Sequence, residues 1–254
     1  MKACVLASGS RGNICYVGTN NHNILIDMGK NTKYIVEKLK EINVDCKDID
    51  VVLISHLHKD HTSALLTFLN RFSPTVCITK KMLDEFKEIK EYSNLYIYED
   101  NINLGDFSIK AIKSSHDSVD SRNFIIEEDD KSLVYITDTG YVRHKYFKDI
   151  SNKNIYLFES NHDIEMLAHG PYPEWLKKRV LSDEGHLSNQ SSGFYLSKLI
   201  GDNTKRVILM HLSEVNNTKE IALDTVKGVL KEYDIEFKDI TCAEQDNRGE
   251  LIIL

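Results

Sequence analysis

Short apolar runs, each bounded by turn-forming residues, predict strands in the first quarter of the chain. Residues 4–7, 14–17 and 23–26 are such runs, and residues 8–13 and 18–21, which are rich in Gly, Ser and Asn, separate them. Residues 51–54 are all apolar, with two Val and one Ile, and lead into a polar segment. Because β-branched residues favour strands, we expect a buried strand there.

Apolar residues at helical spacing predict helices between and after these runs. Asn31 or Thr32 can cap a helix that extends to about Ile42 and directs Ile35 and Leu39 to one face. Further helices are expected over residues 63–72 and 84–91, and one is expected to open at Asn189 and reach Ile200. Later apolar runs predict strands at residues 95–98, 107–112, 123–126, 133–136, 155–158 and 207–210.

Length and composition are those of an ordinary globular domain. With 254 residues, the chain can bury a sizeable core as a single domain over residues 1–254. Its formal net charge of −7 argues against a broad basic surface that grips nucleic acid by charge alone. A nucleic-acid substrate is still compatible with this charge, because bound divalent cations would invert the local sign.

The cysteines and the apolar runs bear on location. The five cysteines are scattered, without a C-x-x-C pair, which is typical of reduced thiols. The apolar run near the N-terminus is too short for a signal-peptide core, and no run approaches the length of a membrane span. We therefore expect a cytoplasmic protein.

Four side chains that can bind metals follow the strand at residues 51–54. They are His56, His58, Asp60 and His61. His56 and His58 are two residues apart, so in an extended loop their imidazoles can point to the same side. One ion could therefore be held by this pair and a second by Asp60 and His61, with the neutral imidazole and carboxylate ligands that Zn²⁺ or Mn²⁺ uses. The alternative, a polar loop with locally bonded histidines, fits this dense spacing poorly.

The pattern H-x-H-x-D-H after a strand resembles the signature of the metallo-β-lactamase superfamily. The resemblance implies an α/β fold, a four-layer αββα sandwich of two mixed sheets flanked by helices. It also implies that His116 completes the first metal site, that Asp138 bridges two ions, and that His211 is the last ligand. An Asp at the position of Asp27 would lie beneath the metal loop and support it, although a turn residue at the end of a strand is an equally good interpretation.

Two later segments resemble the branch of this superfamily that processes tRNA 3′ ends. They are the acidic motif at Glu159 to Asp163 and the loop Gly185-His186-Leu187-Ser188-Asn189. Together with Gly170-Pro171-Tyr172-Pro173, they are most similar to the small bacterial YycJ/WalJ-type exonuclease-like proteins. The resemblance places Asn161, Ser188 and Asn189 at the substrate. Ser188 and Asn189 also suit an ordinary helix cap, and the role of His162 is left open.

The resemblance implies a nuclease with two divalent ions, Zn or Mn, and DNA as its substrate. We expect a phosphodiesterase that acts as a 5′→3′ exonuclease on double-stranded DNA through a metal-bridging hydroxide. Asp60 would bind one ion and orient the nucleophile, His186 would be the general acid, and Glu159 would orient His186 and raise its pKa.

Two other functions fit parts of the pattern. A hydrolase of small thioesters or lactones would use the same ions but would not need the pair of Glu159 and His186. A degenerate binding module is a third reading, against which the seven intact ligands argue. The one basic cluster, residues 177–179 beside Trp175, could track a nucleic-acid backbone, although a solvated helix face explains it better.

Overall fold

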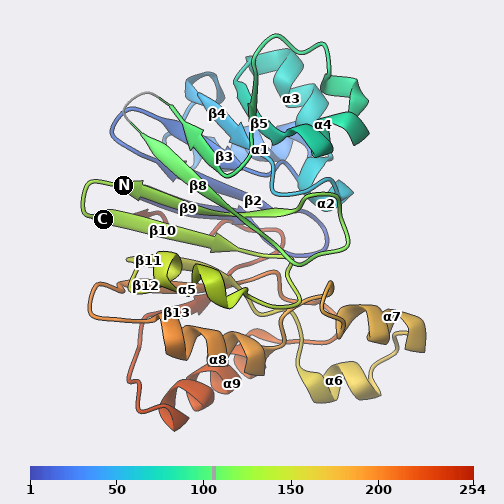
Figure 1. The fold of residues 1–254 in the computed structure, drawn as a ribbon, viewed down its shortest axis with the longest axis vertical. Helices are drawn as coiled ribbons and strands as arrows, with labels where there is room; N and C mark the ends of the chain where they lie inside the picture. The colour runs from blue at the N-terminus through green and yellow to red at the C-terminus, as the bar shows by residue number, and fades with distance from the viewer. Residues whose placement is uncertain (105–106) are drawn as a thin grey trace. The chain divides into compact units, whose positions relative to one another are not determined.

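The computed structural model describes residues 1–104 and 107–254, and the chain divides into two compact units. Unit 1 comprises residues 1–111, 118–122 and 244–254. Unit 2 comprises residues 112–117 and 123–243. Figure 1 labels the helices and strands of both units. The expectation of one domain over residues 1–254 stays a prediction.

Unit 1 contains a mixed seven-stranded sheet with the order β14-β1-β2-β3-β4-β5-β6. Strands β14, β1, β2 and β3 pair antiparallel, and β3 to β6 pair parallel. Parallel neighbours need a crossover connection, and helices supply it here. The strands are β1 (Lys2–Ala7), β2 (Ile14–Gly18), β3 (Asn23–Ile26), β4 (Val51–Leu53), β5 (Thr75–Thr79), β6 (Leu95–Tyr98) and β14 (Ile252–Ile253).

The helices of unit 1 cover this sheet with apolar side chains. In α1 (Thr32–Lys40), the Asn31 side chain accepts a hydrogen bond from Tyr34 N, and Ile35 and Leu39 are buried in the core. Leu65 and Phe68 of α3 join the same core. The other short elements are η1 (Cys46–Asp48), α2 (Lys59–Thr62), α3 (Leu65–Phe72), α4 (Lys80–Glu85), η2 (Lys87–Ile89) and the hairpin of β7 (Asn101–Asn103) with β8 (Ser108–Lys113), whose last two residues belong to unit 2.

Unit 2 contains the strand order β13-β12-β11-β10-β9, again mixed. Strands β10 to β13 run parallel, and β9 turns back on β10 through a hairpin in which Asp129 has a φ of 54°. The strands are β9 (Arg122–Glu128), β10 (Lys131–Ile136), β11 (Ile155–Glu159), β12 (Arg206–Met210) and β13 (Ile240–Cys242).

The core of unit 2 lies between its sheet and helices α8 and α9, which lie side by side in Figure 1. Leu196 and Leu199 of α8 and Val226 and Leu230 of α9 pack in this core. The helices of the unit are η3 (His144–Tyr146), α5 (Phe147–Ile150), α6 (Ile164–His169), α7 (Glu174–Val180), α8 (Asn189–Leu199) and α9 (Lys219–Glu232).

Most predicted elements are present, with shifted ends. The helix predicted over residues 84–91 is wrong, because Thr79 caps a helix at Lys80 that already ends at Glu85. The helix predicted over residues 63–72 is present as α3, which begins at Leu65, and a separate short helix, α2, precedes it over Lys59–Thr62. The predicted strand over residues 107–112 touches the undescribed pair 105–106, and β8 begins at Ser108.

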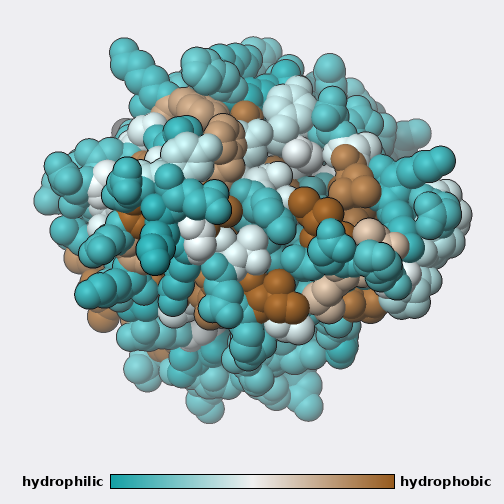
Figure 2. Space-filling view, turned by 90° about the horizontal axis from the view of Figure 1, so that it is seen from below, coloured by the Kyte–Doolittle hydropathy of each residue, from teal (hydrophilic) through white to brown (hydrophobic). Residues whose placement is uncertain are grey.

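None of the described helices combines the length and the apolar composition needed to cross a bilayer. Figure 2 shows a face on which hydrophilic residues predominate and apolar residues form small, separate patches.

Three segments of unit 1 meet at Gly29 through main-chain hydrogen bonds. Asn13 N donates to Asp60 O at 2.8 Å, and Gly29 N donates to Asn13 O at 3.0 Å. Met28 N donates to His61 O at 2.7 Å. A Cβ atom on Gly29 would lie 1.8 Å from Asp60 O and 2.4 Å from Asn13 N. Since both neighbours are main-chain atoms, only glycine fits this junction.

We predict that Gly29→Ala lowers the free energy of unfolding by about 3 kcal/mol, because the new methyl group forces the junction apart. Gly228→Ala is the matched control: Gly228 lies in α9, and nothing stands within 4 Å of its would-be Cβ. That substitution should stabilise the protein by about 1 kcal/mol through helix propensity. Urea unfolding measures both. Equal stability of Gly29→Ala and the natural protein would contradict the packing described here.

Candidate metal centre

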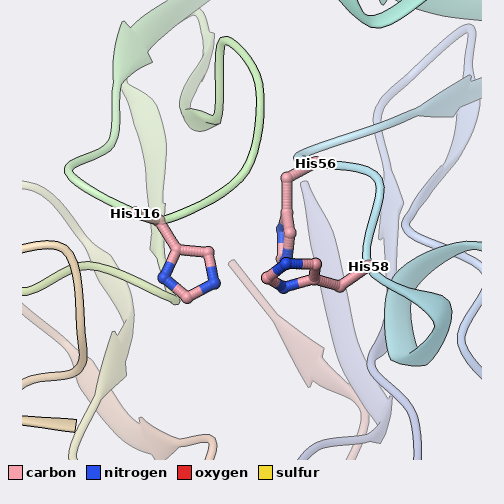
Figure 3. A group of neighbouring side chains, drawn as sticks. All are labelled: His56, His58 and His116. Carbon is pink, nitrogen blue, oxygen red and sulfur yellow. The ribbon is translucent and has the colours of Figure 1, made fainter. Parts of the chain in front are cut away.

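The loop after β4 presents two histidines from unit 1. His58 is the N-cap of α2, with φ −62° and ψ 150°, and His56 lies two residues before it. Their ring centroids are 4.8 Å apart and the rings stand at 82° (Figure 3). Asp60 and His61 follow on the first turn of α2. The ring centroids of His56 and His61 are 4.0 Å apart, so the short helix brings His61 back against the first pair.

Asp27 supports this loop from the end of β3. Its carboxylate is fully buried, and its Oδ2 lies 2.8 Å from His61 Nδ1 and accepts from Ser55 Oγ at 2.7 Å. Oδ1 accepts from Ser55 N at 2.8 Å. An ionised carboxylate only accepts hydrogen bonds, so His61 carries its proton on Nδ1 and keeps the Nε2 lone pair for another partner. The hydrogen bond between Asp27 and His61 is the kind of contact that the expected supporting role of Asp27 needs.

Residues 118–122 form a strap that is hydrogen-bonded to the main chain of the same loop. Arg122 N donates to Ser55 O at 2.8 Å, and Leu57 N donates to Ser118 Oγ at 3.3 Å. The buried Arg122 guanidinium bonds both carboxylate oxygens of Asp120, at 2.9 and 3.0 Å. Both bonds come from the single nitrogen Nη2, and this ion pair fixes the strap, which in turn holds the loop.

In unit 2, candidate ligands lie at the carboxyl ends of neighbouring parallel strands. Asp138 follows β10, Glu159 ends β11 and His211 follows β12. Since β10, β11 and β12 are adjacent, these three side chains come together at one sheet edge. Asp138 and His211 have φ values of 51° and 56°, and Asp27 of unit 1 has 62°. Left-handed backbone at a non-glycine residue costs free energy and concentrates at functional sites.

Glu159 is the centre of the unit 2 cluster. Its Oε1 lies 2.8 Å from His186 Nδ1 and 3.1 Å from His211 Nδ1. Its Oε2 accepts from Thr139 N at 3.0 Å and Leu187 N at 3.2 Å. Burial alone would raise the pKa of Glu159, but the charge of His186 and the hydrogen bonds from His186 and His211 outweigh it and lower the pKa to about 2. Glu159 is therefore an anion that orients two imidazoles.

These contacts are hydrogen bonds rather than a closed metal site around Glu159. Two ligand atoms on one ion, with bonds of about 2.1 Å, would lie roughly 3.4 Å apart in tetrahedral geometry. The 2.8 Å and 3.1 Å distances from Glu159 Oε1 to the Nδ1 atoms of His186 and His211 are shorter. With Nδ1 used in this way, each imidazole keeps Nε2 for a metal or a substrate.

His116 is oriented by α7 and the loop that follows it. Its Nδ1 lies 3.3 Å from Gly185 O, and its Nε2 lies 3.4 Å from Asp117 Oδ1. Arg179 of α7 grips both oxygens of Asp117 with its guanidinium. Burial lowers the pKa of His116, although the charge of Asp138 opposes this. The lowered pKa favours the neutral ring, which is the form that binds metals.

The donors fit divalent cations. In unit 2, Asp138 Oδ1 lies 3.8 Å from His116 Nε2 and 3.5 Å from His211 Nδ1. In unit 1, one loop and one helical turn carry three imidazoles and a carboxylate. Imidazole nitrogen and carboxylate oxygen are the ligands of zinc and manganese sites, and buried carboxylates already fix several of these rings.

The residues expected at the substrate take part in structural hydrogen bonds. Ser188 caps α8 and accepts from Ser191 N at 3.1 Å. Asn189 is fully buried and forms a reciprocal amide pair with Asn217, with both bonds 2.9 Å long. Asn161 Nδ2 donates to His211 O at 2.9 Å. The cap interpretation of Ser188 is thus observed, and contact of these residues with substrate stays a prediction.

Sequence reasoning missed several residues that hold the site. They include Asn13, Ser55, Asp117, Arg122, Arg179 and Asn217. A sequence signal existed for Asn13 alone, because the glycines at positions 9 and 12 mark a tight turn before it. The structure bears this out with φ values of 138° at Gly9 and 137° at Gly12. The others are ordinary polar residues whose partners are remote in sequence.

His162, whose role was left open, is a buried neutral histidine. Its side chain belongs to a residue that is only 1% exposed, and neither ring nitrogen has a hydrogen-bond partner among residues 1–104 and 107–254. Burial lowers its pKa from 6.5 to about 4, although the charge of Glu159 opposes this. Between these values the unfolded chain binds a proton that the folded chain does not, so stability falls as pH falls from 6.5 towards 4.

We predict that replacing this histidine with Leu removes that part of the acid sensitivity. Between pH 6.5 and pH 5, the natural protein should lose about 2 kcal/mol more unfolding free energy than His162→Leu, because the variant lacks the buried imidazole that folding keeps neutral. Urea unfolding at each pH measures the difference. His169→Gln, at an exposed site on α6, is the control and should keep the natural slope. Equal slopes for His162→Leu and the natural protein would contradict the prediction.

Comparison with known proteins places the fold and the family. A family model described as "Beta-lactamase superfamily domain" matches residues 22–212. Exodeoxyribonuclease WalJ of Streptococcus pneumoniae serotype 2 (strain D39) is 36% identical over 241 residues, which cover 92% of this chain and 90% of that protein. Exodeoxyribonuclease YycJ of Bacillus anthracis is 34% identical over 233 residues, with coverages of 90% and 88%.

A solved structure confirms the fold class. The metallo-beta-lactamase fold protein YhfI from Bacillus subtilis aligns with a TM-score of 0.76 over 98% of both chains, at 16% sequence identity. The prediction of an α/β fold with mixed sheets and flanking helices is confirmed by this likeness and by the sheets of the two units. The family match spans most of the chain, and the sequence identity to WalJ and YycJ extends over nine-tenths of it. The chain therefore belongs to the β-lactamase superfamily, in one family with the WalJ and YycJ proteins.

Proposed function

We propose that the protein is a metal-dependent phosphodiesterase that acts as a 5′→3′ exonuclease on double-stranded DNA. Two relatives with 34–36% identity over most of the chain are named exodeoxyribonucleases. The single observation that carries the proposal is the hydrogen bond of 2.8 Å between Glu159 and His186. It provides an oriented, ionisable group for leaving-group protonation, which phosphodiester cleavage needs.

We propose that the protein binds two divalent ions, Zn or Mn, through seven side chains. The set is His56, His58, Asp60, His61, His116, Asp138 and His211. Its support is the order of these residues along the chain, the buried carboxylates Asp27 and Glu159 that orient histidines in each unit, and the family match. When bound, the ions would activate water as a nucleophile at neutral pH and stabilise the charge of the transition state.

The protein's own residues divide the remaining work. Asp60 would orient the nucleophile, and its side chain is 25% exposed, so it can reach a substrate. His186 would donate a proton from Nε2 to the departing sugar oxygen while Glu159 stabilises the imidazolium at Nδ1. Asn161 and Ser188 would contact the phosphate backbone near the N-terminus of α8, whose free N–H groups favour anions.

A hydrolase of small thioesters or lactones is the weaker candidate, since it would have no use for the pair of Glu159 and His186. We also propose a cytoplasmic location. None of the five cysteines in the described chain forms a disulfide, which fits a reducing compartment.

The function is tested with duplex DNA that carries a label at the 5′ end of one strand and with a matched 3′-labelled duplex. With Mn²⁺, the 5′-labelled strand should release short labelled products at once, while the 3′-labelled strand shortens stepwise. EDTA should abolish both. Stable duplexes together with rapid turnover of a thioester substrate would overturn the proposal.

We predict that His186→Ala retains the metals but loses roughly 10²–10⁴-fold in cleavage rate, because it lacks only the proton donor. Elemental analysis measures metal content, and single-turnover cleavage measures the rate. His169→Ala is the matched control, since His169 lies exposed on α6 of the same unit and should leave both quantities unchanged. Loss of metal from His186→Ala would instead make His186 a ligand and overturn its assignment as the acid.

A further inference from the structure

Asn13, at the end of the turn between β1 and β2, lies against two of the proposed metal ligands. The residue is fully buried. Its Nδ2 is 2.9 Å from His61 Nε2 and 3.4 Å from Asp60 Oδ2. All three residues belong to unit 1, and the main chain of Asn13 is bonded to Asp60 O in addition. The amide is therefore held where its donors face the ligand atoms.

The orientation of this amide follows from its other partners. Gly9 N lies 2.8 Å from Asn13 Oδ1, and a main-chain N–H can only donate, so the oxygen must face Gly9 N. Ser8 Oγ lies 3.3 Å from the same oxygen. Nδ2 then donates one proton to Gly9 O at 3.1 Å and directs the other towards His61 and Asp60.

His61 can accept that proton at only one atom. Asp27 Oδ2, 2.8 Å from Nδ1, holds the imidazole proton on Nδ1. Nε2 therefore presents a lone pair, and Asn13 occupies it in this structure. The same lone pair is the one that His61 would offer to a cation.

We propose that Asn13 is a positioning residue that exchanges acceptors when the metal centre fills, an inference that rests on the proposed ligand set. Without metal, its N–H caps His61 Nε2. With metal, that lone pair would bind the ion, and the same N–H can donate instead to Asp60 Oδ2, 3.4 Å from Nδ2. Asn13 then fixes one oxygen of the Asp60 carboxylate, which leaves the other oxygen for the ion and the nucleophile.

The first test is the metal affinity of Asn13→Ala. Removing an outer hydrogen-bond partner of a ligand commonly costs 10–100-fold in affinity, so one ion per chain should bind roughly 10–100-fold more weakly, while the other is retained. Competition with a chromophoric chelator, with Zn²⁺ as the probe, measures both steps. Asn94→Ala is the control, because Asn94 also donates from its amide to a main-chain oxygen, Ser73 O, but lies at an exposed turn.

The second test follows the natural protein itself and uses a variant only to assign the signals. In protein labelled with ¹⁵N at asparagine, the side-chain amide signals of Asn13, assigned by their absence in Asn13→Asp, are followed during titration with Zn²⁺. We expect them to shift at the first or second equivalent and to stay protected from exchange with water, as the proton passes from a nitrogen to an oxygen acceptor. The Asn94 signals should not move.

The outcomes separate this inference from the proposed function. Unchanged Zn²⁺ affinity in Asn13→Ala, or Asn13 signals that ignore saturating Zn²⁺, would overturn the role of Asn13 even if the natural protein cleaves DNA. Conversely, a protein that binds two ions with the expected response of Asn13 but leaves duplex DNA intact would overturn the nuclease proposal and keep this one.

Discussion

The hydrogen bond from a buried carboxylate to the Nδ1 atom of a histidine is the interaction on which the candidate ligands of each unit depend. Asp27 orients His61 in this way, and Glu159 orients His186 and His211 together. Each carboxylate is fully buried and is satisfied by main-chain N–H groups or hydroxyls as well. A buried charge is costly unless it is fully hydrogen-bonded, so these carboxylates are tolerable only with their histidines in place. The orientations of these imidazoles are therefore set by hydrogen bonds within each unit.

The strands were predictable because they are short, apolar and bounded by strong turn signals. The runs that became β1 to β4 and β9 to β12 were all found within one or two residues. Helices at the surface were less predictable. The mixed charges of residues 84–91 suggested a solvated helix, but the side chain of Thr79, which accepts from Met82 N, starts the helix at Lys80. The helix therefore begins about one turn earlier than predicted, because of a single capping hydrogen bond that the mixed charges of this segment do not indicate.

For the site, sequence could supply the donors but not what holds them. The loop from His56 to His61 is dense enough to be read directly, and the pairing of Glu159 with His186 follows from the family resemblance. The partners that fix these groups, such as Arg122 for the loop and Asn217 for Asn189, lie far away in sequence and are common residue types. Their roles arise from tertiary contacts, which no local pattern encodes.

The left-handed backbone at Asp27, Asp138 and His211 limits how the site can evolve. Asparagine, aspartate and glycine accept this conformation readily, whereas β-branched residues meet a steric penalty of about 1–2 kcal/mol. A change in metal preference through new side chains at these corners must therefore satisfy the polypeptide as well as the cation. Substrate choice can vary more easily through substitutions in loops with ordinary backbone conformations, because these accept most side chains.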